Sequence, residues 1–156
     1  MFQKITTKEI EQIQQKWAKS LVKIGKVYTD GKDYKTLAEK HVADFYGYGE
    51  DTVLFKPTLA NNKQFRTTFE SALSYFIGGN PAFPDDQGFA LKPWAKVRFE
   101  NSGFILKEHS AIAMGNYFFV DFAGNETKVE FTFGFYRTDE GHLKINLHHS
   151  SVPYTG

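Results

Sequence analysis

The chain has 156 residues, with 19 basic and 18 acidic side chains that leave a formal net charge of +1 at pH 7. This length predicts one domain spanning residues 1–156, and the near-balance of charge argues against a nucleic-acid or anionic-membrane surface. The absence of cysteine excludes disulfides, iron–sulfur clusters and cysteine nucleophiles. Without a long apolar run or an apolar signal segment, we expect a soluble, cytoplasmic protein; removal of a targeting segment would allow periplasm or plastid.

Aromatic residues are unusually frequent and make up 17% of the chain, with 16 Phe, 8 Tyr and 2 Trp. So many rings cannot all lie on the surface. The composition therefore predicts an aromatic core or an aromatic-lined cavity.

The first third of the chain has helical periodicity. Thr6 and Glu9 form a capping-box pair that marks the beginning of a helix. The apolar side chains that follow recur every three or four residues and so share one helix face: Ile10, Ile13, Trp17, Leu21 and Ile24. Asp30-Gly31 ends the pattern.

Two more helices and a short strand follow. The spacing predicts a helix over 34–46 that ends at Gly47, and residues 52–57 have a β-like composition. A third apolar stripe predicts another helix, with Gly78-Gly79 as its left-handed cap: Phe65, Phe69, Leu73, Phe76 and Ile77.

A turn-rich segment, residues 79–94, separates these helices from the rest. A loop of this length in a compact domain is usually functional. The pair Asp85-Asp86 within it is predicted to be a solvated turn.

From Ala95 onward the hydropathy alternates with a period of two, which predicts strands around residues 95–100, 104–114, 117–122, 128–136 and 143–148. Gly124-Asn125 and the segment 139–141 supply hairpin turns. Helices followed by strands predict an α+β domain, a cone-shaped half-barrel in which about three N-terminal helices pack on a curved antiparallel sheet.

The densest polar segment is His148-His149-Ser150-Ser151, at the end of the last strand. Alternation carried forward from Leu147 predicts that His149 and Ser151 point inward, whereas a β-bulge would reverse this and turn His148 and Ser150 inward. An imidazole and a hydroxyl at the mouth of an apolar cavity could bind a small polar molecule or transfer a proton. From the residues alone, simple hydrogen bonding to the backbone remains open as the alternative.

A metal site is not favoured by the histidines. His148 and His149 are adjacent, so their side chains point to opposite faces of a strand. The other three histidines, His41, His109 and His142, lack ligand spacing, and a catalytic zinc needs about three protein ligands.

Two segments resemble the iota-class carbonic anhydrases, specifically their cyanobacterial and algal branch: residues 75–101 (YFIGGNPAFPDDQGFALKPWAKVRFEN) and 148–153 (HHSSVP). The resemblance implies a cone-shaped fold of the nuclear-transport-factor and ketosteroid-isomerase type. It also implies reversible hydration of CO2 to bicarbonate without a metal, with zinc or manganese as the runner-up. The chain departs from the family pattern at Val152-Pro153-Tyr154, where relatives tend to have Met-Pro-Glu.

The resemblance also implies which residues form the site. Thr58 matches the family's threonine and Tyr75 its tyrosine. By strand parity His149 and Ser151 match the catalytic histidine and serine, with His149 as the proton acceptor. His148 and Ser150 are the alternative register and are assigned to substrate binding.

Two other functions remain open. A non-enzymatic ligand-binding or oligomerisation module would use the same pocketed fold, which commonly forms homodimers through its sheet. An isomerase would need a carboxylate base in the cone, but alternation places Asp121 and Glu130 on the opposite face from their phenylalanine neighbours.

Overall fold

The computed structural model describes residues 3–156. Its helices are α1 (Thr7–Thr29), α2 (Tyr34–Phe45) and α3 (Phe69–Ile77), together with the 3-10 turn η1 (Phe89–Leu91). The three predicted helices are therefore confirmed. None of the helices within residues 3–156 is long and apolar enough to cross a bilayer.

The helix ends follow from their capping residues. The Thr6 hydroxyl accepts from the Glu9 N–H at 3.2 Å, and the Glu9 carboxylate accepts from the Thr6 N–H at 3.1 Å, as the capping box requires. Thr68 caps α3 in the same way, and Gly78 ends it with a φ of 64°. Because α3 begins only after Thr68, Phe65 lies outside it and is 71% exposed. Its predicted place in the apolar stripe was wrong.

Five strands form one sheet in the order β1-β5-β4-β3-β2. The strands are β1 (Leu54–Lys56), β2 (Trp94–Leu106), β3 (Ser110–Asp121), β4 (Glu126–Arg137) and β5 (Leu143–Ser151). β1 pairs with β5 in parallel and the other pairs are antiparallel. The sheet is therefore mixed, and the prediction of a wholly antiparallel sheet holds only for β2 to β5.

The segment from Phe104 to Met114 is a hairpin and not one strand as predicted. Its first residues end β2 and its last begin β3. The Lys107 N–H donates to the Ser110 carbonyl at 2.9 Å and closes a tight turn between them. A register shift between Asn101 and Gly103 marks a bulge in β2, which increases the local twist of the sheet.

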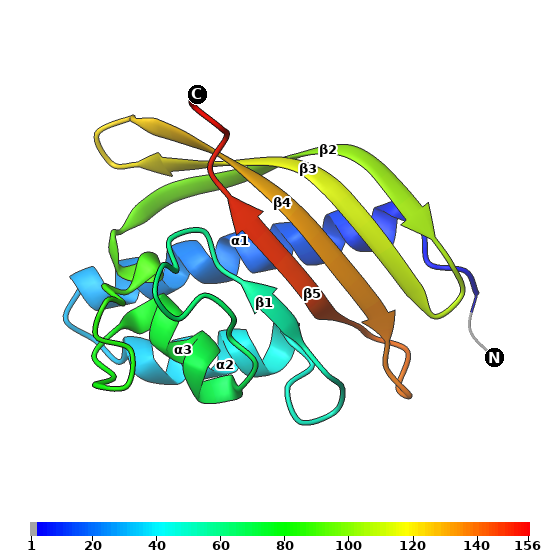
Figure 1. The fold of residues 1–156 in the computed structure, drawn as a ribbon, viewed down its shortest axis with the longest axis horizontal. Helices are drawn as coiled ribbons and strands as arrows, with labels where there is room; N and C mark the ends of the chain where they lie inside the picture. The colour runs from blue at the N-terminus through cyan, green and yellow to red at the C-terminus, as the bar shows by residue number, and fades with distance from the viewer. Residues whose placement is uncertain (1–2) are drawn as a thin grey trace.

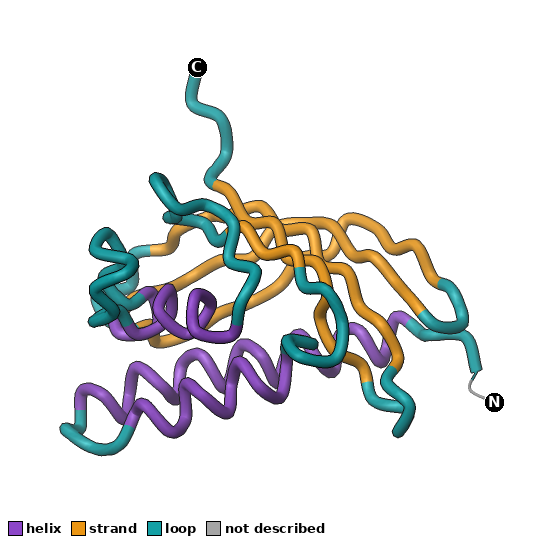
Figure 2. The backbone as a smooth tube through the Cα atoms, turned by 60° about the horizontal axis from the view of Figure 1, so that its bottom comes forward, coloured by secondary structure: helices purple, strands orange, loops and turns teal. Residues whose placement is uncertain are grey.

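The helices lie together on one side of the sheet, and the long strands curve over them (Figure 1 and Figure 2). The residues buried between the two layers include Trp17 on α1 and a run of rings on β3 and β4. α3, η1 and the loops beside them gather at one end of the sheet in Figure 1. That end of the layer is where the candidate site lies.

Candidate active site

A β-bulge in β5 changes which of its residues point toward the core. Gly134 of β4 pairs with Leu147, but the next residue, Phe135, pairs with Ile145. Asn146 is thus one extra residue on β5, and the alternation reverses after it. Ile145, His148 and Ser150 are all buried, the last two at 2% and 1% exposure.

The predicted inward pair, His149 and Ser151, lies on the other face of the sheet. His149 is exposed, and the Ser151 hydroxyl donates to the Glu130 carboxylate at 3.0 Å. The parity prediction was therefore wrong, because it assumed a regular strand. The alternative register, with His148 and Ser150 inward, is the one that the structure has.

The side chains that face inward define a small inner pocket at the narrow end of the cone. Its volume is about 10 Å³, which is the scale of a single water molecule. Most of the wall is aromatic. The lining residues are Trp17, Phe55, Pro57, Thr58, Tyr75, Phe76, Phe89, Tyr117, Phe119, His148 and Ser150.

Six polar side chains form a continuous hydrogen-bonded series beside this pocket, which we call the polar chain. At its inner end the Trp17 Nε1–H donates to the Tyr46 hydroxyl at 3.2 Å, and that hydroxyl is 2.8 Å from His148 Nδ1. His148 Nε2 is 3.0 Å from the Tyr117 hydroxyl. From there the series runs through the Ser150 Oγ to the Thr58 Oγ1, with two contacts of 2.5 Å.

Burial keeps the titratable members of this group neutral. Desolvation holds the pKa of the His148 imidazole well below its usual range, and the neighbouring His41 and His149 act in the same direction. Desolvation also raises the pKa of the Tyr46, Tyr75 and Tyr117 phenols. A charged form of any of these groups would lose its hydration inside the apolar wall.

Tyr75 approaches the outer end of the polar chain from α3. Its hydroxyl oxygen accepts from the Leu59 N–H at 3.2 Å, which leaves its own hydrogen free to donate. Hydrogen bonding from this N–H and from the Thr58 side chain partly offsets the rise in its pKa. Thr58 and Tyr75 therefore present hydroxyl groups from two elements at the same place.

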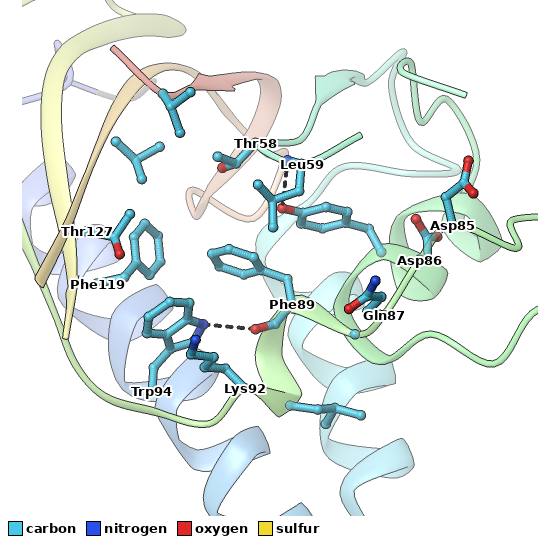
Figure 3. A pocket seen from close by; sticks show the side chains of 15 residues that line it. Thr58, Leu59, Asp85, Asp86, Gln87, Phe89, Lys92, Trp94, Phe119 and Thr127 are labelled. Carbon is cyan, nitrogen blue, oxygen red and sulfur yellow. Dashed lines mark hydrogen bonds between the residues drawn. The ribbon is translucent and has the colours of Figure 1, made fainter. Parts of the chain in front are cut away.

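A wider cavity of about 620 Å³ adjoins the inner pocket, and we call it the vestibule. Thr58, Tyr75, Phe89 and Phe119 line both. Figure 3 shows Thr58 and Leu59 facing Phe89 across this space, with the Trp94 indole donating to the Phe89 carbonyl at 2.8 Å. The two cavities are therefore neighbours that share part of their walls.

A buried ion pair holds the loop that forms part of the vestibule wall. The Arg66 guanidinium donates to both Asp86 oxygens at 2.7 and 2.8 Å, and the two side chains are only 3% and 4% exposed. The Ser74 hydroxyl also donates to Asp86, at 2.6 Å. Asp86 is therefore a structural anchor, and its predicted place in a solvated turn was wrong. Its neighbour Asp85 accepts from the Asn62 side chain at the surface.

The structure brings together Thr58, Tyr75, His148 and Ser150 and leaves out His149 and Ser151. It also adds Tyr117, Tyr46 and Trp17, which sequence reasoning did not assign to the site. Tyr117 has the parity of Asp121, which the alternation placed on the outer face, and Trp17 lies in a helical apolar stripe that is typical of ordinary core. The positions of these two residues in the sequence do not indicate that their side chains make hydrogen bonds in the folded protein.

The carboxylates considered for an isomerase do not serve the pocket. Glu130 is exposed on the outer face of the sheet, as predicted. Asp121 lies on the same face of β3 as Tyr117 and Phe119, which point toward the core, contrary to the prediction. Its carboxylate nevertheless accepts from the Ala123 and Asn125 N–H groups in a hairpin turn, and these bonds hold its pKa below the usual range.

Residues 3–156 contain no cluster of three or more histidine, aspartate or glutamate side chains that could hold a metal ion. His41 is buried in the core, where its Nδ1 is 2.7 Å from the Ser20 hydroxyl. It is a core histidine.

Fold and site together define a class: a cone-shaped α+β domain with a polar group at its narrow end. A nuclear transport factor 2-like superfamily protein from Salmonella enterica has this fold, with a TM-score of 0.58 at 13% identity over 95% of this chain and 91% of that one. A calcium/calmodulin-dependent protein kinase II association domain from Xanthomonas campestris gives a TM-score of 0.66 at 21% identity over 97% and 91%.

More specific similarities identify the family. The family model for metal-independent carbonic anhydrase matches residues 8–152. A metal-independent carbonic anhydrase from Nostoc sp. is 45% identical over 153 residues, covering 96% of this chain and 75% of that protein. The crystal structure of a cyanobacterial iota-carbonic anhydrase complexed with bicarbonate has a TM-score of 0.95 at 42% identity, covering 100% of this chain and 97% of that one.

The chain belongs to the metal-independent carbonic anhydrase family. It is a lyase of the iota class, whose reaction is the reversible hydration of CO2 to bicarbonate and a proton. The family assignment also decides between a metal-free reaction and the zinc or manganese alternative, in favour of the first.

Proposed function

We propose that CO2 is hydrated in the inner pocket and that Thr58, Tyr75, Ser150 and Tyr117 supply the hydroxyl groups that act on it. The observation that carries this proposal is the convergence of these hydroxyls on a space of about 10 Å³ with aromatic walls. His148 supports the group through its contact with the Tyr117 hydroxyl. The bicarbonate complex of the cyanobacterial relative supports bicarbonate as a ligand of this fold.

The chemistry follows from the size and polarity of the pocket. Apolar CO2 lies against the rings, and its oxygen accepts from Thr58 and Tyr75. Water attacks the carbon from the vestibule side, so a C–O bond forms while the electrons of one C=O bond move to the oxygen held by the hydroxyls. Positioning of this kind can contribute roughly 7–11 kcal/mol in ideal cases, and donors aimed at the developing charge add to it.

The proton of the attacking water leaves through the vestibule. We assign His148 to holding the Tyr117 hydroxyl and not to the general-base role that the resemblance suggested for His149. His149 is outside the pocket, and burial makes the His148 imidazole a weak base. Water and buffer in the vestibule accept the proton.

Stopped-flow CO2 hydration tests the proposal, with protein treated exhaustively with chelator and checked by elemental analysis. We expect hydration above the buffer rate with no stoichiometric metal. Activity that follows bound zinc or manganese would contradict the metal-free reaction. An inactive wild type with a normal thermal melt would favour the alternative, a non-enzymatic ligand-binding or oligomerisation module.

We also propose that two copies of the chain associate through the outer face of the sheet. Ile105 on β2 pairs with Ile112 on β3, and both are exposed together with Met114, at 56%, 37% and 57%. Such a contiguous apolar surface is typical of interfaces, and a net charge of +1 opposes self-association only weakly. Light scattering should give the mass of a dimer for the wild type and of a monomer for Met114→Lys. A monomeric wild type would contradict the proposal.

A further inference from the structure

The inner end of the polar chain has a feature that the proposed function does not use. Tyr46 meets His148 at Nδ1, the ring nitrogen that does not contact Tyr117, and Trp17, which lines the inner pocket, donates to Tyr46. Among residues 3–156 the Tyr46 hydroxyl has two partners, the Trp17 indole N–H at 3.2 Å and His148 Nδ1 at 2.8 Å. Tyr46 is 1% exposed, so water does not supply a third.

An indole N–H can only donate a hydrogen bond, and this fixes the direction of the next one. The Tyr46 oxygen accepts from Trp17, and its own hydrogen has one available acceptor, His148 Nδ1. If Nδ1 carried a proton instead, the Tyr46 hydrogen would be buried without an acceptor, which is costly. His148 is therefore the neutral tautomer with its proton on Nε2.

The same donor-to-acceptor direction continues to the Thr58 end of the polar chain. The His148 Nε2–H donates to the Tyr117 oxygen, whose own hydrogen then turns to the Ser150 Oγ. The Ser150 hydrogen turns to Thr58, 2.5 Å away. The Thr58 hydrogen is left over at the outer end of the polar chain, where the Tyr75 oxygen and the inner pocket lie.

Aromatic stacking keeps the imidazole in this orientation. Phe55 stacks on one side of the His148 ring with a centroid distance of 4.7 Å, and Phe133 lies 4.1 Å away with an interplanar angle of 26°. A ring held by two stacked neighbours cannot turn its nitrogens away from Tyr46 and Tyr117 without displacing them.

We propose that Tyr46 is a positioning residue that locks His148 in the Nε2–H tautomer, so that the Tyr117 and Ser150 hydrogens point along the polar chain and the Thr58 hydrogen is left at the inner pocket. The pocket then presents a donor to the oxygen on which charge develops as CO2 becomes bicarbonate. Its only accepting imidazole nitrogen faces Tyr46, away from the reacting molecule. This inference rests on the proposed function for its catalytic meaning, but the tautomer is a property of the protein alone.

Nitrogen NMR of the whole protein with 15N-labelled histidine tests the tautomer directly, because a protonated ring nitrogen and an accepting one have well-separated chemical shifts. The His148 signals are those that disappear in His148→Gln. We expect Nε2 protonated and Nδ1 accepting in the wild type, with a preference of about tenfold or more. A proton on Nδ1, or an even mixture of the two forms, would overturn the inference.

Tyr46→Phe tests the positioning role. It removes the hydrogen bond to Nδ1 and should change the Nδ1 shift while lowering kcat about five- to tenfold with little change in KM. Tyr136→Phe is the control, since it also loses a phenol hydroxyl, which donates to Glu50 at the surface and not to the polar chain. It should leave the His148 shifts and the rate unchanged. An unchanged Nδ1 shift in Tyr46→Phe would contradict the role of Tyr46.

The two proposals fail in different ways. A wild type without hydration activity would end the proposed function and leave the tautomer measurement intact. An active wild type with Nδ1 protonated would end this inference alone. The wild-type spectrum decides the tautomer even if Tyr46→Phe does not fold.

Discussion

Ser150 and Ser151 are adjacent residues of β5 whose side chains lie on opposite faces of the sheet. Replacing each in turn with alanine therefore tests the two faces separately. Ser150→Ala removes a buried hydroxyl that lies 2.5 Å from both the Thr58 and the Tyr117 oxygens. Ser151→Ala removes a hydroxyl that donates to the exposed Glu130 carboxylate. The two variants lose the same atom from opposite sides of the sheet.

The expected magnitudes follow from the partners that each change leaves behind. Without Ser150 the buried Tyr117 hydrogen loses its acceptor, which should cost about 1–2 kcal/mol of unfolding free energy. For a chain of this size that lowers the melting temperature by roughly 2–8 °C. The connection between Tyr117 and Thr58 is also broken, and the loss of an oriented donor typically lowers the rate by roughly 10²–10³-fold. Ser151→Ala should stay within about 0.5 kcal/mol of the wild type at an unchanged rate.

Stopped-flow hydration with a pH indicator and a thermal melt on the same samples measure both quantities. Comparing the two variants in one buffer removes any difference in proton acceptors. A rate loss in Ser151→Ala together with a normal rate in Ser150→Ala would refute the reasoning, since it would put the catalytic serine on the outer face.

Three further predictions concern stability. Burial lowers the pKa of His41 to about 3 and that of His148 well below its usual range, so only the unfolded chain takes up these protons as pH falls below about 6.5. The free energy of unfolding in urea should therefore be constant above about pH 6.5. Below that pH it should decrease by up to about 1.4 kcal/mol per pH unit for each histidine. A constant free energy of unfolding from pH 6.5 to 5 would contradict this. Asp86→Asn leaves a buried guanidinium without its carboxylate and should cost about 3–5 kcal/mol in the same assay, whereas a change under 1 kcal/mol would show that the ion pair is dispensable. Gly115→Ala would place a methyl group against the backbone of β2 and should cost roughly 1–3 kcal/mol; Gly103→Ala, which meets nothing within 4 Å, is its control, and equal melting temperatures for the two would count against the packing.

Local patterns were enough to predict most of the elements. The Thr6 and Glu9 capping box, the stripe that includes Trp17 and the alternation in the long strands are all set by residues close in sequence. The parallel pairing of β1 is different. Three residues carry no information about their partner, and the partner strand lies about 90 residues further along the chain.

The orientation of the site could not be predicted, because the bulge at Asn146 leaves no mark in the hydropathy pattern. Ile145 and Leu147 are both apolar, so the strand looks regular up to His148. The burial of Asp86 was hidden for a similar reason. Its partner Arg66 stands 20 residues earlier in another loop, and only the folded chain brings the two charges together.

The small volume of the inner pocket has a consequence for selectivity. A space that holds one molecule at a time must lose its water before CO2 enters, and it must lose the product before the next cycle begins. The cross-section of a molecule therefore decides whether it can enter the inner pocket. We expect molecules as thin as CO2 to enter the inner pocket, and branched or aromatic acids to stop in the wider vestibule. A blocker of that outer space would inhibit by closing the passage, without any need to imitate the substrate.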